Sequence, residues 1–290
     1  MSFRSLEEIC RLAGDRDGGF FRAVLEDDMN DRQVPEKNSI KKMAYMYRAM
    51  KDADGVYDKN VMSRSGFVGN DGDKMEQFLA AGGGICGDYM GRVIVRALKM
   101  AECNACMRRI VAAPTAGSCG VLPAVLLTYQ EQMKEPEAKM VEAMYVAAGI
   151  GQVIASRASI SGAEGGCQAE IGAASAMAAG ALTYLRGGSC EAIAHSVAMA
   201  LKNLLGLVCD PVAGLVEVPC VKRNVVGAVN AVSSSEMALA GIRSVIPPDE
   251  VIDAMQSVGR KMDASLKETG EGGLAMTPTA RKLTEELRRI

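Results

Sequence analysis

Three cysteines stand out among the residues that could do chemistry, because each has glycine or proline within two positions. Cys167 follows two glycines, Cys209 lies two residues before a proline, and Cys220 directly follows a proline. A chain turns at such residues, so the three thiolates could point into one shared space. Three thiolates suit an iron–sulfur cluster with one iron left open, since a missing fourth Cys ligand leaves a Lewis acid. Each cysteine alone would more often be a small buried side chain, and the spacing leaves both interpretations open.

The other six of the nine cysteines are expected to be small buried side chains. An odd number of cysteines without a secretion signal does not indicate a disulfide framework. Cys103-x-x-Cys106 resembles a metal-binding pair, but it lies inside a helical pattern and has no second pair at a suitable spacing. We therefore expect this pair to be structural.

Two polar segments could bind an anion. The segment 113–120 contains Thr115, Gly117 and Ser118 just before a predicted helix, whose backbone N–H groups could hold a substrate carboxylate. Lys222-Arg223-Asn224 follows Cys220 directly, and its cations could hold a carboxylate or offset the charge of a cluster. The first segment could equally be an ordinary interhelical turn, and the second the solvated start of a helix.

These residues must be positioned by helices, because no strand-like alternation persists anywhere in the 290 residues. The chain is 49% hydrophobic but only 4% aromatic, and it is rich in Ala, Gly and Met. Such a composition favours closely packed helices. The predicted fold class is all-α: a compact multi-helix domain at 61–290 that binds the cluster, with a helical arm at 1–60 that is separate or part of the same domain.

Apolar residues at helical spacing, together with caps and breakers, give the predicted elements. The helices are expected at about 5–14, 38–54, 72–81, 88–113, 121–134, 136–157, 163–185, 189–206, 223–244 and 248–266, and from 279 onward. The stretch between 55 and 87 is otherwise irregular and includes Ser63-Arg64-Ser65-Gly66, and long irregular stretches in compact chains are often functional.

Charge and hydropathy bear on the partners and the compartment. The net charge is −2 and no basic stripe is present, so nucleic acid is not an expected partner. The most apolar run, 171–185, is shorter than the roughly 20 residues of a membrane-spanning helix, which predicts a buried helix and no membrane partner. The charged amino terminus does not resemble a signal peptide, and we expect a cytoplasmic protein.

Two blocks carry a resemblance to a known family. Ser161–Gly172, with the sequence SGAEGGCQAEIG, and Leu207–Asn224, with the sequence LVCDPVAGLVEVPCVKRN, resemble the signature of the α subunit of bacterial iron–sulfur L-serine dehydratase. Segments around 63–66, 112–120 and 270–278 also resemble family blocks. The resemblance spans nearly the whole chain.

The resemblance implies a lyase that converts L-serine to pyruvate and ammonia with a [4Fe-4S] cluster and without pyridoxal phosphate. It implies that Cys167, Cys209 and Cys220 are the cluster ligands, and that a separate β subunit completes the enzyme. The open iron would serve as the Lewis acid for the leaving hydroxyl. The family blocks suggest substrate-binding roles for six residues: Ser63, Arg64, Ser65, Thr115, Gly117 and Ser118.

The base that removes the α-proton is not assigned by the sequence. The candidates are Lys222, Ser65, Ser118 and the lone histidine, His195, although a histidine on a helix is more often structural. The base could also belong to the partner subunit. Two alternatives to L-serine dehydration remain: a related cluster-dependent L-cysteine desulfidase, and a non-catalytic helical iron–sulfur or scaffold subunit.

Overall fold

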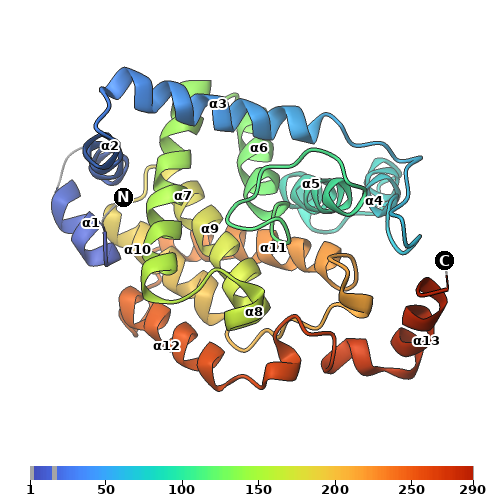
Figure 1. Cartoon of the computed structure of the whole chain (residues 1–290). Coiled ribbons are helices and arrows are strands. Elements are labelled where there is room, and N and C mark those ends of the chain that lie inside the picture. The colour runs from blue at the N-terminus through green and yellow to red at the C-terminus, as the bar shows by residue number, and fades with distance from the viewer. Residues whose placement is uncertain (1–2, 15–17, 290) are drawn as a thin grey trace.

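The computed structural model describes residues 3–14 and 18–289 (Figure 1). These residues form thirteen α-helices, and their only strand-like feature is an isolated bridge between Cys209 and Lys267. The predicted all-α class is therefore confirmed. None of the helices in the described ranges is long and apolar enough to cross a membrane.

The helices follow one another with short connections. Their bounds are α1 Leu6–Ala13, α2 Gly19–Arg32, α3 Glu36–Asp54, α4 Asp71–Ala80, α5 Gly87–Ala105, α6 Val121–Met133, α7 Glu137–Arg157, α8 Gly162–Gly165, α9 Ala173–Leu185, α10 Cys190–Lys202, α11 Cys220–Leu239, α12 Pro248–Lys261 and α13 Pro278–Leu287. A π-helix, Gln168–Gly172, precedes α9, and three 3₁₀ turns lie at Val212–Gly214, Ala264–Leu266 and Gly273–Met276.

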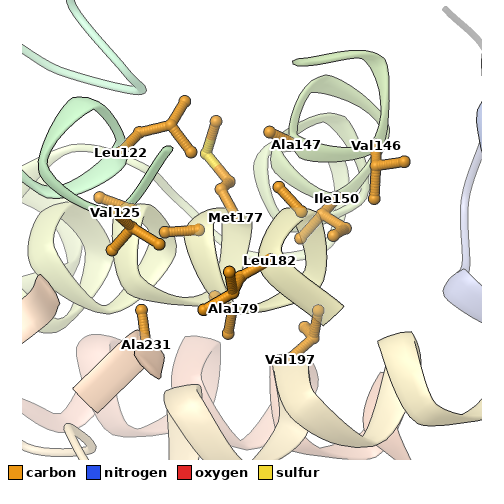
Figure 2. Close-up of a cluster of buried hydrophobic side chains, with 14 of the residues drawn as sticks. Leu122, Val125, Val146, Ala147, Ile150, Met177, Ala179, Leu182, Val197 and Ala231 are labelled. Carbon is orange, nitrogen blue, oxygen red and sulfur yellow. The ribbon is translucent and has the colours of Figure 1, made fainter. Parts of the chain in front are cut away.

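The core is built around α9, in which every residue is buried. Most residues of its sequence, AASAMAAGALTYL, have small side chains, so α6, α7, α10 and α11 can pack closely around it. A Cβ added to Gly180 would overlap the Ile150 side chain of α7, which shows how close that approach is. Figure 2 shows this cluster, with side chains from five helices: Leu122, Val125, Val146, Ala147, Ile150, Met177, Ala179, Leu182, Val197 and Ala231.

The first three helices pack on this core. Helix α3 crosses α6 and α7, while α12 lies on the opposite side of the molecule (Figure 1). Helix α2, which the sequence analysis did not predict, contacts α7, and Phe20, Val24 and Leu25 of α2 are buried. The described residues before residue 60 thus share one hydrophobic cluster with the rest of the chain, while the predicted boundary at 60 stays a prediction.

Several predicted helices end or break earlier than expected, and two of these differences involve cysteines. The helix predicted over 88–113 ends at Ala105, where Met107 adopts a left-handed φ of 57° and Arg108 N–H donates to the Cys103 carbonyl oxygen. Cys106 is therefore the C-cap residue and does not lie within a longer helix. The helix predicted over 163–185 is interrupted at Gly166, whose φ is +75°.

Candidate functional site

The three cysteines singled out in the sequence come together at one place in the fold. Cys167 lies at the break before the π-helix, Cys209 in the segment after α10, and Cys220 is the first residue of α11. All three are buried, with exposed fractions of 3%, 3% and 8%. The backbone turns at Gly166 and Pro219 put the first and last of them at the start of a helix, as their glycine and proline neighbours suggested.

Gln168 fixes the Cys167 turn against the Cys209 segment. Its backbone N–H donates to the Leu207 carbonyl at 2.9 Å, and its side-chain oxygen accepts from Gly206 N–H at 2.9 Å. The amide nitrogen donates to the Met255 carbonyl of α12 at 3.0 Å. Gln168 is 1% exposed, so these bonds are made away from water and hold two of the cysteine segments in register.

The segment 264–274 holds Cys209 from the other side. Cys209 N–H donates to the Leu266 carbonyl at 2.8 Å, and Glu268 N–H donates to the Cys209 carbonyl at 2.7 Å. The next residue, Asp210, accepts from Leu274 N–H at 2.8 Å and from the Arg223 guanidinium at 2.8 Å. The Gly-rich carboxyl-terminal tail is thus part of the site's framework.

The three thiols affect one another's ionisation. A hydrogen bond from the Cys209 thiol lowers the pKa of Cys167. Burial opposes this effect, and the nearby Arg223 charge adds to it. Donating that bond, together with burial, raises the pKa of Cys209. Burial, and then the nearby Cys167, raises the pKa of Cys220 to about 12. Cys167 is therefore the thiol of the three that most readily becomes a thiolate, the form that binds metal.

Arg223 is the cation of this site. It donates from Nη1 to the Val208 carbonyl at 2.7 Å and from Nη2 to Asp210, and it also hydrogen-bonds Cys167. Burial lowers the pKa of Arg223, but Cys167 and Asp210 outweigh that effect and raise it overall. The guanidinium therefore stays charged and favours negative sulfur beside it.

Glu170, on the π-helix, is an acid–base group next to the thiols. A Cβ added to Gly162 would stand 2.7 Å from Glu170 Oε2 and 3.2 Å from Cys209 Sγ, so both groups lie against the same glycine. Burial raises the pKa of Glu170, and a hydrogen bond from the Thr115 hydroxyl partly opposes that effect. A carboxyl group with a raised pKa beside a cluster of thiols is a candidate proton carrier.

The loop 113–120 is anchored to α11 by Asn224. The Asn224 amide nitrogen donates to the Gly117 carbonyl at 2.8 Å, and its oxygen accepts from Gly120 N–H at 2.8 Å. Thr115 and Ser118 hydrogen-bond each other at 3.1 Å between hydroxyl oxygens. A Cβ added to Gly117 would lie 3.4 Å from Glu170 Oε1, so this loop borders Glu170.

Ser63 and Ser65 bind a carboxylate of the chain itself. Both hydroxyls donate to Glu217 Oε2, the first at 2.7 Å. Arg64 between them is exposed. A cavity of about 620 Å³ opens here, lined by Ser65, Glu217 and three arginines, Arg64, Arg281 and Arg288.

Two of the predicted proton carriers point elsewhere. Lys222 Nζ forms an ion pair with Asp71 on α4 at 2.8 Å, and its side chain is largely exposed. His195, on α10, accepts from Ser244 N–H at 3.3 Å and lines a different cavity. Their catalytic roles stay predictions.

No three His, Cys, Asp or Glu side chains within residues 3–14 and 18–289 converge closely enough to hold a single metal ion. A four-iron cluster needs a different arrangement, because each of its four irons is normally bound by the sulfur of a separate cysteine. Three buried thiols, from three segments and beside an arginine, match that donor type.

Comparison with known proteins decides the family. The sequence profile described as "Serine dehydratase alpha chain" matches residues 17–275. This chain belongs to the serine dehydratase alpha chain family. That membership confirms the resemblance seen in the two cysteine blocks and the prediction of a lyase.

Two alpha-chain relatives match this chain almost end to end. "Probable L-serine dehydratase, alpha chain" of Bacillus subtilis is 42% identical over 285 residues, 98% of this chain and 95% of the relative. "L-serine dehydratase, alpha chain" of Peptoniphilus asaccharolyticus is 38% identical over 96% of both chains. "L-serine dehydratase 2" of Escherichia coli is 45% identical over 62% of this chain, which covers only 40% of that relative. Some relatives therefore carry a large further part.

Sequence reasoning missed three residues of this site: Glu170, Asn224 as an anchor, and Glu217. All three lie inside the blocks that carry the resemblance. Nothing in their spacing indicated their contacts, because each partner lies far away in the sequence. A polar residue inside a block of glycines and cysteines was the available signal.

Proposed function

We propose that this chain is the α subunit of an L-serine dehydratase and that Cys167, Cys209 and Cys220 hold its [4Fe-4S] cluster. The proposal is supported most by one observation: three buried thiols from separate segments meet beside an arginine and a carboxyl group, in a chain of this family. When bound, a cluster with one iron lacking a Cys ligand would supply a Lewis acid for the serine hydroxyl.

The elimination needs groups that the chain itself provides. L-Serine must lose its α-proton and its β-hydroxyl, and the aminoacrylate formed then tautomerises and hydrolyses to pyruvate and ammonia. We assign the removal of the α-proton to the Glu170 carboxylate. Its pKa, raised first by burial, brings it closer to neutral pH, where general-base catalysis is efficient. The Thr115 hydroxyl, which hydrogen-bonds Glu170, would orient that carboxylate.

The substrate carboxylate would bind on the side of the hydroxyl-rich loops. Thr115, Gly117 and Ser118 border Glu170 through the loop that Asn224 anchors. Arg64 and Ser65 face a cavity with two further arginines, which would attract an anionic group before it reaches the site. The separate β subunit, which we propose because the relatives are named alpha chains and the longer ones carry a further part, would complete the enclosure.

The cluster assignment can be tested by single Cys→Ala substitutions at the three positions. Purified without oxygen, each variant should lose iron and sulfide together with L-serine deamination. Cys119→Ala is the matched control, because Cys119 is equally buried and donates to the Met100 carbonyl away from these thiols. Full metal content and parent-rate activity in all three variants would refute the assignment.

The base assignment needs a different comparison. Glu170→Gln should keep its iron yet lose about 10²–10⁴-fold in kcat, whereas Lys222→Met should change kcat little. If Lys222→Met lost kcat and Glu170→Gln did not, Lys222 would be the base instead. Rates on L-serine and L-cysteine with the same preparation distinguish the dehydratase from a desulfidase.

A further inference from the structure

A second pair of thiols, Cys10 and Cys190, lies outside the proposed cluster site. Cys10 is on α1 and Cys190 is the first residue of α10. The Cys10 thiol donates to the Cys190 carbonyl oxygen at 3.3 Å, and each thiol shifts the pKa of the other. None of the residues assigned to the elimination takes part in this contact.

Both sulfur-bearing residues can be reached from solvent. Cys10 and Cys190 are partly exposed, unlike the three buried cluster candidates, and both line a cavity of about 1280 Å³. A structural cysteine is usually enclosed and inert, whereas a reactive one is partly exposed in a setting that favours the thiolate.

The local setting gives the two thiols different roles. A hydrogen bond from the Cys10 thiol, against burial and with help from Phe20 N–H, lowers the pKa of Cys190. The same bond, together with burial and the nearby Asp249 and Glu191 carboxylates, raises the pKa of Cys10. Cys190 is also at the first turn of a helix of 13 residues, where the backbone dipole favours a thiolate.

We propose that Cys10 and Cys190 are a redox pair that takes small disulfides, such as glutathione disulfide, as its oxidant and closes into a disulfide between α1 and α10. The Cys190 thiolate attacks one sulfur of the oxidant, forming a mixed disulfide and releasing one glutathione thiolate. Cys10 then attacks the Cys190 sulfur, its proton passes to the departing second glutathione, and the protein disulfide forms. Two protein thiols are oxidised and one glutathione disulfide is reduced to two thiols.

The pair is suited to the second step because the Cys10 sulfur already lies against Cys190, 3.3 Å from its carbonyl oxygen. A mixed disulfide on Cys190 would have the Cys10 sulfur beside it as a resolving thiol. The link would tie the first described helix to the helix that packs directly on α9.

The experiment exposes the full chain to glutathione disulfide without oxygen, in a Cys86→Ser background because Cys86 is exposed. After alkylation of the remaining thiols and tryptic digestion, peptides 5–11 and 187–202 should be joined, while Cys103 and Cys106 are alkylated as thiols. In a Cys10→Ser variant the resolving sulfur is missing, so glutathione should accumulate on Cys190. In a Cys190→Ser variant Cys10 should stay free.

Three results would overturn the inference. The first is that both cysteines remain free thiols while Cys103 or Cys106 is modified. The second is that the parent protein keeps glutathione on Cys190 without forming the cross-link. The third is that Cys10→Ser and its parent give the same adducts. Mass spectrometry identifies these peptides directly, so the outcome does not depend on whether the cluster is present or on L-serine turnover.

Discussion

Asn224→Ala tests whether one amide positions the loop beside the proposed active site. Asn224 is 1% exposed and joins α11 to the loop 113–120 through Gly117 and Gly120. The substitution leaves the buried Gly120 N–H without an acceptor, which costs about 1–3 kcal/mol, and removes the bond to Gly117, which contributes about 0.5–1.5 kcal/mol. We therefore expect a loss of about 2–4 kcal/mol in the free energy of unfolding.

Asn230→Ala is a matched control on the same helix. Asn230 is also buried and makes three side-chain hydrogen bonds, to Ser175 at 2.9 Å, the Ala200 carbonyl at 2.9 Å and Asn203 at 2.7 Å. Its loss should cost a similar amount of stability. Because Asn230 does not contact the loop 113–120, only Asn224→Ala should also raise the KM for L-serine.

Chemical denaturation without oxygen measures the stability, and amide exchange of peptides covering 113–120 reports the loop directly. A loss of 2 kcal/mol confined to the loop would speed its exchange roughly 30-fold. The reasoning would be refuted if loop exchange in Asn224→Ala matched that of the parent, or if Asn230→Ala raised KM equally.

Three further perturbations follow from contacts of the site. Burial first raises the pKa of Glu170 above its ordinary 4.5, so the folded metal-free protein holds this proton more tightly than the unfolded chain. The stability from this group is therefore present below pH 4.5 and is lost as pH rises through the folded pKa. Glu170→Gln should reduce this loss of stability between about pH 5 and about pH 8, as measured by chemical denaturation. Gly273→Ala should destabilise the protein more than Gly214→Ala. Both glycines have a left-handed φ, +56° and +70°, but the added Cβ at Gly273 would overlap the buried Asp210 carboxylate, whereas at Gly214 the space is open and only about 1 kcal/mol of backbone strain is expected. Equal unfolding midpoints in urea for the two variants would contradict the clash. Gln168→Ala should lower iron per chain as its register bonds are lost, while Gln130→Ala, whose amide bonds Tyr47 and Glu135, should not; equal iron in both would show that register does not matter.

The helices were predictable where an amphipathic or small-residue pattern ended at a strong breaker. The predictions for 121–134 and 136–157 match α6 and α7 closely, because Gly120 and Pro136 mark their starts. Helix α2 was missed although all residues from Phe20 to Leu25 except Arg22 are apolar, since its second half is acidic and weakens the periodic signal. Its burial against α7 supplies what the local pattern lacked.

Site residues divide by the distance of their partners. Cys167 and Cys220 could be picked out because glycine and proline beside them signal turns in the sequence itself. Glu170 could not be linked to Thr115, nor Ser63 to Glu217, because those contacts arise only when helices pack. The glycines before Cys167 signalled a turn, but one helix was still predicted over 163–185, and the left-handed φ of +75° at Gly166 breaks it.

The starts of two long buried helical segments, at Cys167 and Cys220, lie at the sulfur site. The first four N–H groups of a helix lack intrahelical partners, and its aligned peptide dipoles place a partial positive charge at that end. The polypeptide backbone itself therefore sets a favourable potential for anions at this point, independently of any side-chain charge. Such a potential favours electron-rich sulfur at this point in addition to the charge of Arg223.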